Sequence, residues 1–366
     1  MPKWLSICYK ICLYGFALAG FFLIAGWLAV KFHLTDTAGG VDVNDRYLAR
    51  LAGSFNEKVA TDPARLATDL CRVGVLKKFY PANAGKIQAE YERTRSGALL
   101  FKMIAAAEMY ALADKEYVKE SLKCAEEKSS AEQLLSSLGP SNLYAWVGTP
   151  EWQTIASALA KDQEVIARVA AETKIPARLI AAQIVGEQIR LFKDNREVFK
   201  QFFQPLKILG NEVKFSLGVA GIKEETAKAI EQNLTDKTSP MYLGEDDEKL
   251  LVFVAANRDE ERFNRLTDPD NRYYSYLYTA LFLKQIEKQW RDAGFAIADR
   301  PEILSTIFNV GFEKSVPKAD PQVGGSEIEL GGRTYTFGGL AYEFYYSGEL
   351  AGEFPLVDTI GHSPKL

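Results

Sequence analysis

Hydrophobic residues follow two patterns along this chain, one continuous and one periodic. The continuous pattern is ICLYGFALAGFFLIAGWLAV, which fills residues 11–30 without a single charge. At a rise of 1.5 Å per residue, a helix of this length matches the ~30 Å hydrocarbon core of a bilayer. The run therefore predicts one transmembrane helix.

The charges beside this run predict its orientation. Lys3 and Lys10 precede it, whereas Lys31 is soon followed by acidic residues, so the positive-inside rule places the N-terminus in the cytoplasm and the bulk in the periplasm or outside the cell. A cleaved signal peptide is the competing interpretation, but its apolar region normally spans only ~7–15 residues. No cysteine follows the run to serve as a lipidation site. We therefore expect a retained single-pass membrane anchor.

The periodic pattern predicts amphipathic helices through most of the remaining chain. TDTAGGVDVND (35–45) is small and polar and is typical of a short linker. Apolar residues then recur at three- and four-residue spacing, which is the helical period. Two clear segments carry this spacing: Leu66, Leu70, Val73 and Leu76, and Leu100, Ile104, Ala107 and Ala111.

Glycine and proline interrupt the pattern at 138–152 and indicate a domain boundary there. Beyond it, helices are predicted at 157–172, 176–192, 223–234, 272–293 and 301–310. Pro176 and Pro301 suit the first position of a helix, and Gly311 suits a C-terminal cap. SEIELGGRTYTF alternates around Gly331 and Gly332, which predicts a two-residue β-hairpin turn.

The predicted fold class is thus mainly α, with three parts. Residues 1–34 form the membrane anchor and its flank, 35–150 a helical domain, and 151–366 a second α domain with a C-terminal extension that contains the small β-hairpin.

Composition narrows the chemistry that this chain can perform. The net charge of −4 leaves no basic excess for phosphates, so nucleic acid is not an expected partner. The two histidines are His33, at the foot of the apolar run, and His362, in the extreme C-terminal tail, and neither position has the pattern of a folded segment. Ser/His/Asp, Cys/His and most zinc sites need an imidazole, so carboxylates are the expected catalytic groups, with no metal and no cofactor.

Four cysteines divide into two pairs. Cys8 and Cys12 lie at the apolar run, whereas Cys71 and Cys124 lie beyond it, in the part expected outside the cytoplasm. Cys71 and Cys124 form either a disulfide or two free buried thiols, because both alternatives have the same sequence pattern.

Glu187 is the candidate acid. Within IPARLIAAQIVGEQIRLF it shares one helical stripe with Ile180, Ile184 and Leu191, so a carboxylate interrupts an apolar face. An unpaired buried charge costs several kcal/mol, so the group either pairs with a cation or stays protonated, and a protonated carboxyl suits general-acid cleavage of a glycosidic bond. In the alternative interpretation, Glu187 leans outward and pairs with Arg190 or Arg178, or lies at the edge of the stripe.

Two later segments accompany this helix. FSLGVAGIKEETAKAIE (215–231) combines a glycine-bearing turn with a following helix, and Gly218 and Gly221 allow close approach of a ligand to the backbone. ILSTIFNVGF places Asn309 in the last turn of a helix that ends at Gly311. Its amide is expected to reach a cleft, unless it simply terminates the helix.

The order of these segments over about 160–315 resembles the lysozyme-like superfamily, in particular the lytic transglycosylases and goose-type lysozymes. In that family a helix with the catalytic Glu precedes S-x-G-x-x-Q-I-K/R, a Thr-Ala pair and A-Y-N-A-G. The matching residues here are Glu187, then Ser216, Gly218, Ile222, Lys223, Thr226 and Ala227, and finally Asn309 and Gly311.

The resemblance implies a role for each of these groups. Glu187 would protonate the glycosidic oxygen between N-acetylmuramic acid and N-acetylglucosamine, and Ser216, Gly218 and Asn309 would contact the glycan. Two positions depart from the family pattern, because Gly221 replaces the usual Gln and Phe308 the usual Tyr. Tyr273, Tyr274 or Tyr276 would then replace the Tyr that orients the acid. RYYSYLY (272–278) and YEFYYSG (342–348) offer further aromatic side chains, either for a sugar groove or for the core.

Two functions follow as hypotheses. The first is a membrane-anchored lytic transglycosylase that acts on a peptidoglycan glycan strand with a single Glu as acid and base. The second is a catalytically weak or silent lysozyme-like scaffold that binds glycan or an envelope protein partner.

Overall fold

The computed structural model describes residues 39–54, 62–126, 142–193 and 216–357, together with positions 10, 12–18, 20–22, 24–25 and 28. The chain is mainly helical, with three two-stranded antiparallel sheets among the described residues. No helix in this part of the chain is both long and apolar enough to cross a bilayer. The transmembrane helix predicted at 11–30 falls partly outside the described positions.

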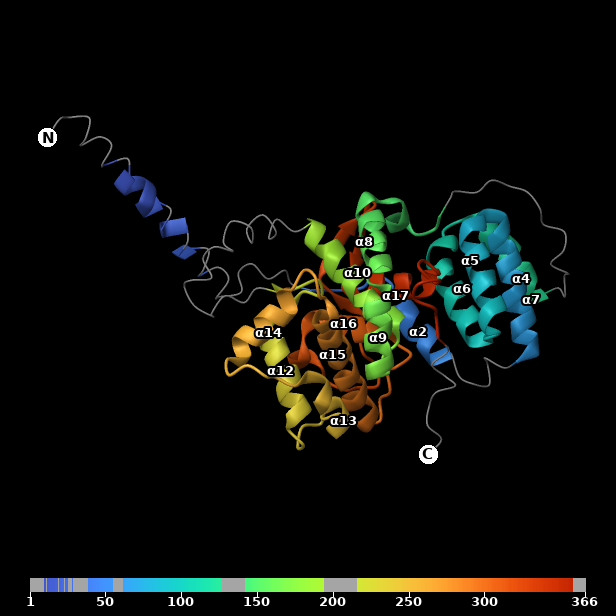
Figure 1. The fold of residues 1–366 in the computed structure, drawn as a ribbon. Helices are drawn as coiled ribbons and strands as arrows, with labels where there is room; N and C mark the ends of the chain where they lie inside the picture. The colour runs from blue at the N-terminus through green and yellow to red at the C-terminus, as the bar shows by residue number, and fades with distance from the viewer. Residues whose placement is uncertain are drawn as a thin grey trace.

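Helices α2 and α4–α7 form the N-terminal group, seen at the right of Figure 1. Their bounds are α2 Asp45–Ser54, α4 Pro63–Phe79, α5 Pro81–Thr94, α6 Gly97–Ala111 and α7 Lys115–Glu126. Asp62 caps α4 by accepting a hydrogen bond from the amide of Ala64, and Ser96 caps α6 by accepting one from Leu99. Helix α6 is apolar almost all round and is buried among the others.

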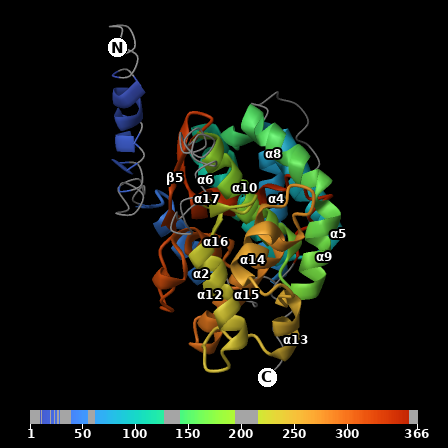
Figure 2. The same cartoon turned by 60° about the vertical axis from the view of Figure 1, so that its left-hand side comes forward.

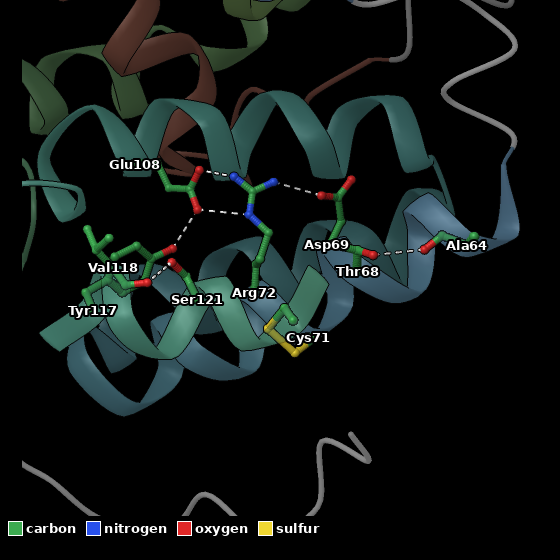
Figure 3. The surroundings of a disulfide bond; sticks show 10 residues. Ala64, Thr68, Asp69, Cys71, Arg72, Glu108, Tyr117, Val118 and Ser121 are labelled. Atoms are coloured by element: carbon green, nitrogen blue, oxygen red, sulfur yellow. Dashed lines mark hydrogen bonds and ion pairs between the residues drawn. A yellow bond between two sulfur atoms is a disulfide. The ribbon is translucent and has the colours of Figure 1, made fainter. Parts of the chain in front are cut away.

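A disulfide between Cys71 and Cys124 joins α4 to α7, with 5.7 Å between the two Cα atoms. Of the two alternatives that the sequence left open, the structure selects the covalent one. Beside it, Arg72 bridges Asp69 and Glu108, and the Tyr117 hydroxyl donates to Glu108 at 2.7 Å (Figure 3). Because Glu108 is almost fully buried, these partners compensate for the loss of water around its charge.

The remaining helices form the larger group. They are α8 Pro150–Lys161, α9 Gln163–Thr173, α10 Ala177–Lys193, α12 Glu224–Thr235, α13 Glu245–Glu248, α14 Arg258–Thr267, α15 Tyr273–Asp292, α16 Pro301–Val310 and α17 Phe337–Ser347. Short 3₁₀ helices lie at Ala145–Gly148 (η2), Lys249–Leu251 (η4) and Phe312–Lys314 (η5). Figures 1 and 2 show α10, α16 and α17 near the centre, with α12–α15 along one side.

Helix α17 joins the two groups. All of its residues are buried, and it packs against α10 and α16 as well as against α6 of the N-terminal group. The buried side chains of both groups consequently form one hydrophobic core. The division at about residue 150 stays a prediction, since residues 127–141 lie outside the described part.

Three strand pairs complete the fold. β1 (Gly40–Val41) pairs with β4 (Gly324–Gly325), β2 (Ser216–Leu217) with β3 (Ile222–Lys223), and β5 (Glu327–Leu330) with β6 (Arg333–Thr336). The β5–β6 hairpin confirms the predicted turn, because Gly331 and Gly332 both have positive φ, as a two-residue hairpin turn of this kind requires.

The predicted linker at 35–45 was wrong for its second half. Gly40 and Val41 are strand residues, and Asp42 is buried where its carboxylate accepts a hydrogen bond from the Thr336 hydroxyl at 2.6 Å. Asp45 accepts another from the amide of Val323 at 2.7 Å. Small and polar residues are typical of linkers, but here glycine allows close strand pairing and the carboxylates bind distant donors.

Helix boundaries were predicted within about one residue for α10, α12, α15 and α16. The helix expected at 157–172 was wrong, because the chain breaks at Asp162, where α8 ends and α9 begins. Asp162 accepts hydrogen bonds from Arg272 and the Tyr276 hydroxyl, so a contact distant in sequence stabilises this break.

Candidate functional site

Glu187 lies in the central helix α10 and is 4% exposed. Its neighbours on the stripe, Ile180 and Ile184, are buried as the apolar pattern predicts. Arg190, one turn later, donates from Nη2 to Oε2 of Glu187 at 2.6 Å. A paired guanidinium favours the ionised carboxylate and offsets much of its desolvation cost. Of the two cations proposed as structural partners, Arg190 rather than Arg178 makes this contact.

The glycine turn between β2 and β3 packs directly on Glu187. Gly221 has a φ of +61°, and a Cβ at this position would overlap with Oε2 of Glu187. Gln188 fixes the same turn to α10 by donating from Nε2 to the carbonyl of Val219 at 2.6 Å. A residue without a side chain is therefore needed at 221 for the carboxyl group to lie where it does.

The other end of the turn contacts α14 and α15. Gly218 has a φ of +67°, and a Cβ there would overlap with the carbonyl oxygen of Leu266 and crowd the hydroxyl of Ser275. The turn is thus held between α10 on one side and α14 and α15 on the other. Ser216 pairs through its backbone with Lys223, and its side chain lies outside the described part of the structure.

We expect Gly221→Ala to lower the free energy of unfolding by about 2–4 kcal/mol. The left-handed conformation costs an L-residue about 1–2 kcal/mol, and the overlap with Glu187 adds a packing cost of similar size. Gly294→Ala is the matched control, because Gly294 also has a positive φ, +86°, but has open space around it. Urea denaturation measures both variants, and equal losses would show that Glu187 is not tightly packed against this turn.

Asn309 lies near the glycine turn and α10, but its side chain binds a neighbouring segment of the chain at Ser326. Its Oδ1 accepts hydrogen bonds from the amide and hydroxyl of Ser326, at 2.8 and 3.0 Å. Phe337 lies between Asn309 and α10. Its Cβ is close to Gly325, which also neighbours Asn309, and the far end of its ring is close to Gly186. Asn309 therefore binds the segment after β4, a role that neither the cleft prediction nor the helix-terminus alternative described.

Phe308, which stands where the family has Tyr, belongs to an aromatic cluster. Its ring is 5.2 Å from Phe282 and 6.3 Å from Phe337, measured between centroids. Phe337 of this cluster packs against Gly186, the residue that precedes Glu187. An apolar ring at 308 suits this packing, whereas a hydroxyl would have to find a partner there.

The three tyrosines proposed to replace the Tyr expected at position 308 have other neighbours in the structure. Tyr273 donates to Glu172 of α9, and burial raises the pKa of its hydroxyl with help from that carboxylate. Tyr276 donates to Asp162, and burial likewise raises its pKa. Tyr274 lines a surface pocket instead. Tyr273 therefore hydrogen-bonds to α9 and Tyr276 to the residue just before α9, whereas Tyr274 lies at a separate cavity.

This cavity has a volume of about 450 Å³. It lies along α14 and the first turn of α15, and Glu187 is not among its lining residues. This cavity could not be predicted from the sequence, because exposed Asn, Glu and Arg on a helix are ordinary surface residues. Gln188 and Phe337, which position the turn and the helix around Glu187, also lacked any recognisable motif.

No three His, Cys, Asp or Glu side chains in the described ranges are arranged to hold a metal ion. Comparisons of the chain with models of protein families, with curated proteins and with solved structures found no match. The resemblance to the lysozyme-like superfamily thus depends on the three ordered motifs and on where the structure places them.

Proposed function

We propose that this protein is a lytic transglycosylase of the cell envelope, with a lysozyme-like domain, that cleaves peptidoglycan with Glu187 as its acid and base. The observation that carries the proposal is the contact between Glu187 and the glycine turn at Gly221. A buried carboxyl on a central helix, with a backbone turn packed against it, matches the order and the roles of the family motifs. Ser216, Gly218 and Asn309 remain the proposed glycan contacts.

The proposed reaction uses one carboxyl group twice. Protonated Glu187 gives its proton to the glycosidic oxygen as the C1–O4 bond breaks. The resulting carboxylate then accepts the proton of the muramic acid C6 hydroxyl, whose oxygen bonds to C1 and closes the anhydro ring. The acid step requires the protonated form, so in this proposal the incoming strand separates Glu187 from Arg190.

The proposed location is the outer side of a membrane. The uncharged run at 11–30 supports an N-terminal anchor with a cytoplasmic N-terminus. The Cys71–Cys124 disulfide supports a periplasmic or extracellular position for the bulk, because disulfides persist in oxidising compartments.

The alternative function is a silent scaffold that binds glycan or an envelope protein. One observation favours it: Arg190 holds Glu187 in an ion pair, which disfavours the protonated acid. Gly221 and Phe308 lack the polar groups usual in the family, and this also favours the scaffold function.

Clearing of a peptidoglycan gel by the full chain tests the proposal. We expect the wild type to clear the band, and Glu187→Gln to lose at least about a hundredfold in activity, the usual contribution of a general acid. Glu116→Gln, at an exposed position on α7, is the control and should clear like the wild type. Anhydromuramic ends among the products would identify a transglycosylase rather than a hydrolase.

Absence of clearing by the wild type, together with retained binding to peptidoglycan, would instead establish the scaffold. Clearing by Glu187→Gln at the wild-type rate would remove the acid role from this residue.

A further inference from the structure

The pocket on α14 lies on the side of this helix that faces away from the glycine turn. Arg262 and Leu266 are the buried residues of α14, and the carbonyl of Leu266 contacts the turn at Gly218. The pocket residues Glu260, Glu261, Asn264, Arg265 and Asp268 recur at three- and four-residue spacing on the opposite stripe. The pocket is therefore separate from the surroundings of Glu187.

Arg265 forms the wall of this pocket and is held rigidly. Its guanidinium lies 4.7 Å from the ring centroid of Phe253 and 4.4 Å from that of Tyr274. Nη2 donates to the carbonyl of Val252 at 2.7 Å and pairs with Glu261. Nη1 is buried and has no hydrogen-bond partner within the described residues. Because Nη1 is enclosed in this way, the guanidinium is a fixed wall of the pocket.

The charges around the pocket restrict the class of ligand that can bind there. Glu261 neutralises Arg265 and also accepts hydrogen bonds from the amides of Val254 and Ala255. Glu260 and Asp268 remain as carboxylates at the exposed rim. The pocket therefore carries net negative charge, which disfavours carboxylate ligands and accepts neutral ones.

The other lining groups suit a neutral ligand rich in hydroxyl and amide groups. Asn264 and Asn271 present exposed amide side chains at the rim, and these groups both donate and accept hydrogen bonds. Tyr274 adds a half-buried ring, whose face can meet the C–H groups of a pyranose. A volume of about 450 Å³ lies in the range of small-molecule sites.

We propose that this pocket binds an uncharged N-acetylated hexosamine unit of a glycan chain, with the amides of Asn264 and Asn271 hydrogen-bonded to the ligand and the Tyr274 ring against its C–H groups. The choice of a glycan as ligand rests on the proposed function. The site itself selects the neutral N-acetylglucosamine type of unit against the carboxylate-bearing muramic type.

Binding of chitotetraose, a chain of four neutral N-acetylglucosamine units, tests the site by isothermal titration calorimetry. The full chain carrying Glu187→Gln is the reference, since it cannot turn the probe over. We expect Asn264→Ala and Tyr274→Ala each to weaken binding by about tenfold, the loss of one or two hydrogen bonds or of one stacking ring. Gln153→Ala, an exposed amide on α8, is the matched control and should bind normally.

Two outcomes would overturn the proposal: no binding of chitotetraose, or binding that neither pocket variant alters. A muramic-acid tetrasaccharide bound as tightly as chitotetraose would refute the charge selection. The result is independent of catalysis, because a protein that binds chitotetraose through this pocket but never clears peptidoglycan would retain the site and lose the proposed enzymatic function. Clearing of peptidoglycan without binding of chitotetraose at the pocket would support the enzymatic function and refute the pocket site.

Discussion

Replacing Arg178 with Met should lower the free energy of unfolding by about 3–5 kcal/mol, the range for removing one side of a buried charged contact. Arg178 is fully buried in α10, and its guanidinium donates to three backbone carbonyls near the end of α17. The acceptors are Tyr345 at 2.7 Å, Phe354 at 2.9 Å and Phe344 at 2.8 Å. Phe344 and Tyr345 lie in the last turn of α17, where carbonyls lack intrahelical partners, and Phe354 lies beyond the helix. The carbonyl of Phe344 also accepts from the Ser347 hydroxyl, so the variant would remove the Arg178 donor mainly at the expense of Tyr345 and Phe354.

Urea denaturation followed by circular dichroism measures this loss. Arg168→Met is the matched control, because Arg168 is an exposed arginine whose pair with Glu172 should be worth less than about 1 kcal/mol. Arg178→Lys separates charge from geometry: one ammonium cannot span three carbonyls, so an intermediate loss is expected. A loss below about 1 kcal/mol for Arg178→Met would mean that α17 does not depend on this side chain.

Glu343 should make the protein less stable as the pH rises from about 5 to about 8. This carboxyl is buried in α17, where the Tyr110 hydroxyl and the indole of Trp146 donate to it. Burial raises the pKa of Glu343 from 4.5 to about 8, although these two hydrogen bonds lower it in part. The folded state therefore holds a proton that the unfolded state releases, so stability is complete below pH 4.5 and falls until the pH passes the folded pKa.

The expected size of this loss is about 3 kcal/mol between pH 5 and pH 8, at 1.36 kcal/mol for each unit of pKa shift. Glu343→Gln should remove most of the slope, because a neutral amide can accept from Trp146 and donate to Tyr110 without titrating. Glu116→Gln, at an exposed position, should keep the wild-type slope. Unfolding free energies at several pH values decide the matter, and parallel curves for Glu343→Gln and the wild type would exclude this carboxyl as the source.

Helix ends with local determinants were predictable. Pro301 and Gly311 fixed α16, and Gly331 with Gly332 fixed the β5–β6 hairpin, because each of these residues restricts its own backbone angles. Helix α17 was not predicted, since its sequence FGGLAYEFYYS starts with two glycines and is buried on every side, so it has no amphipathic stripe. Helix α14 was missed for the opposite reason, because six of its ten residues are charged and one of them, Arg262, stands on its buried side.

The candidate site shows the same limit. The stripe of α10 predicted that Glu187 would be buried, which the structure confirms, but it could not choose between Arg178 and Arg190 as a partner. That choice depends on α17, whose carbonyls engage Arg178, and α17 lies about 150 residues further along the chain. Gly221 looked like a departure from a family pattern, and only its distant contact with Glu187 explains why glycine stands there.

The pairing of β1 with β4 also bears on how the polypeptide matures during translation. Gly40 and Val41 leave the ribosome long before their partners Gly324 and Gly325, which stand nearly three hundred residues later in the sequence. At ~5–20 residues per second, the first strand waits on the order of tens of seconds for its partner. Nascent chains can therefore reach the native state only after Gly325 has emerged, and holding chaperones have that interval in which to bind the unpaired strand at Gly40 and Val41.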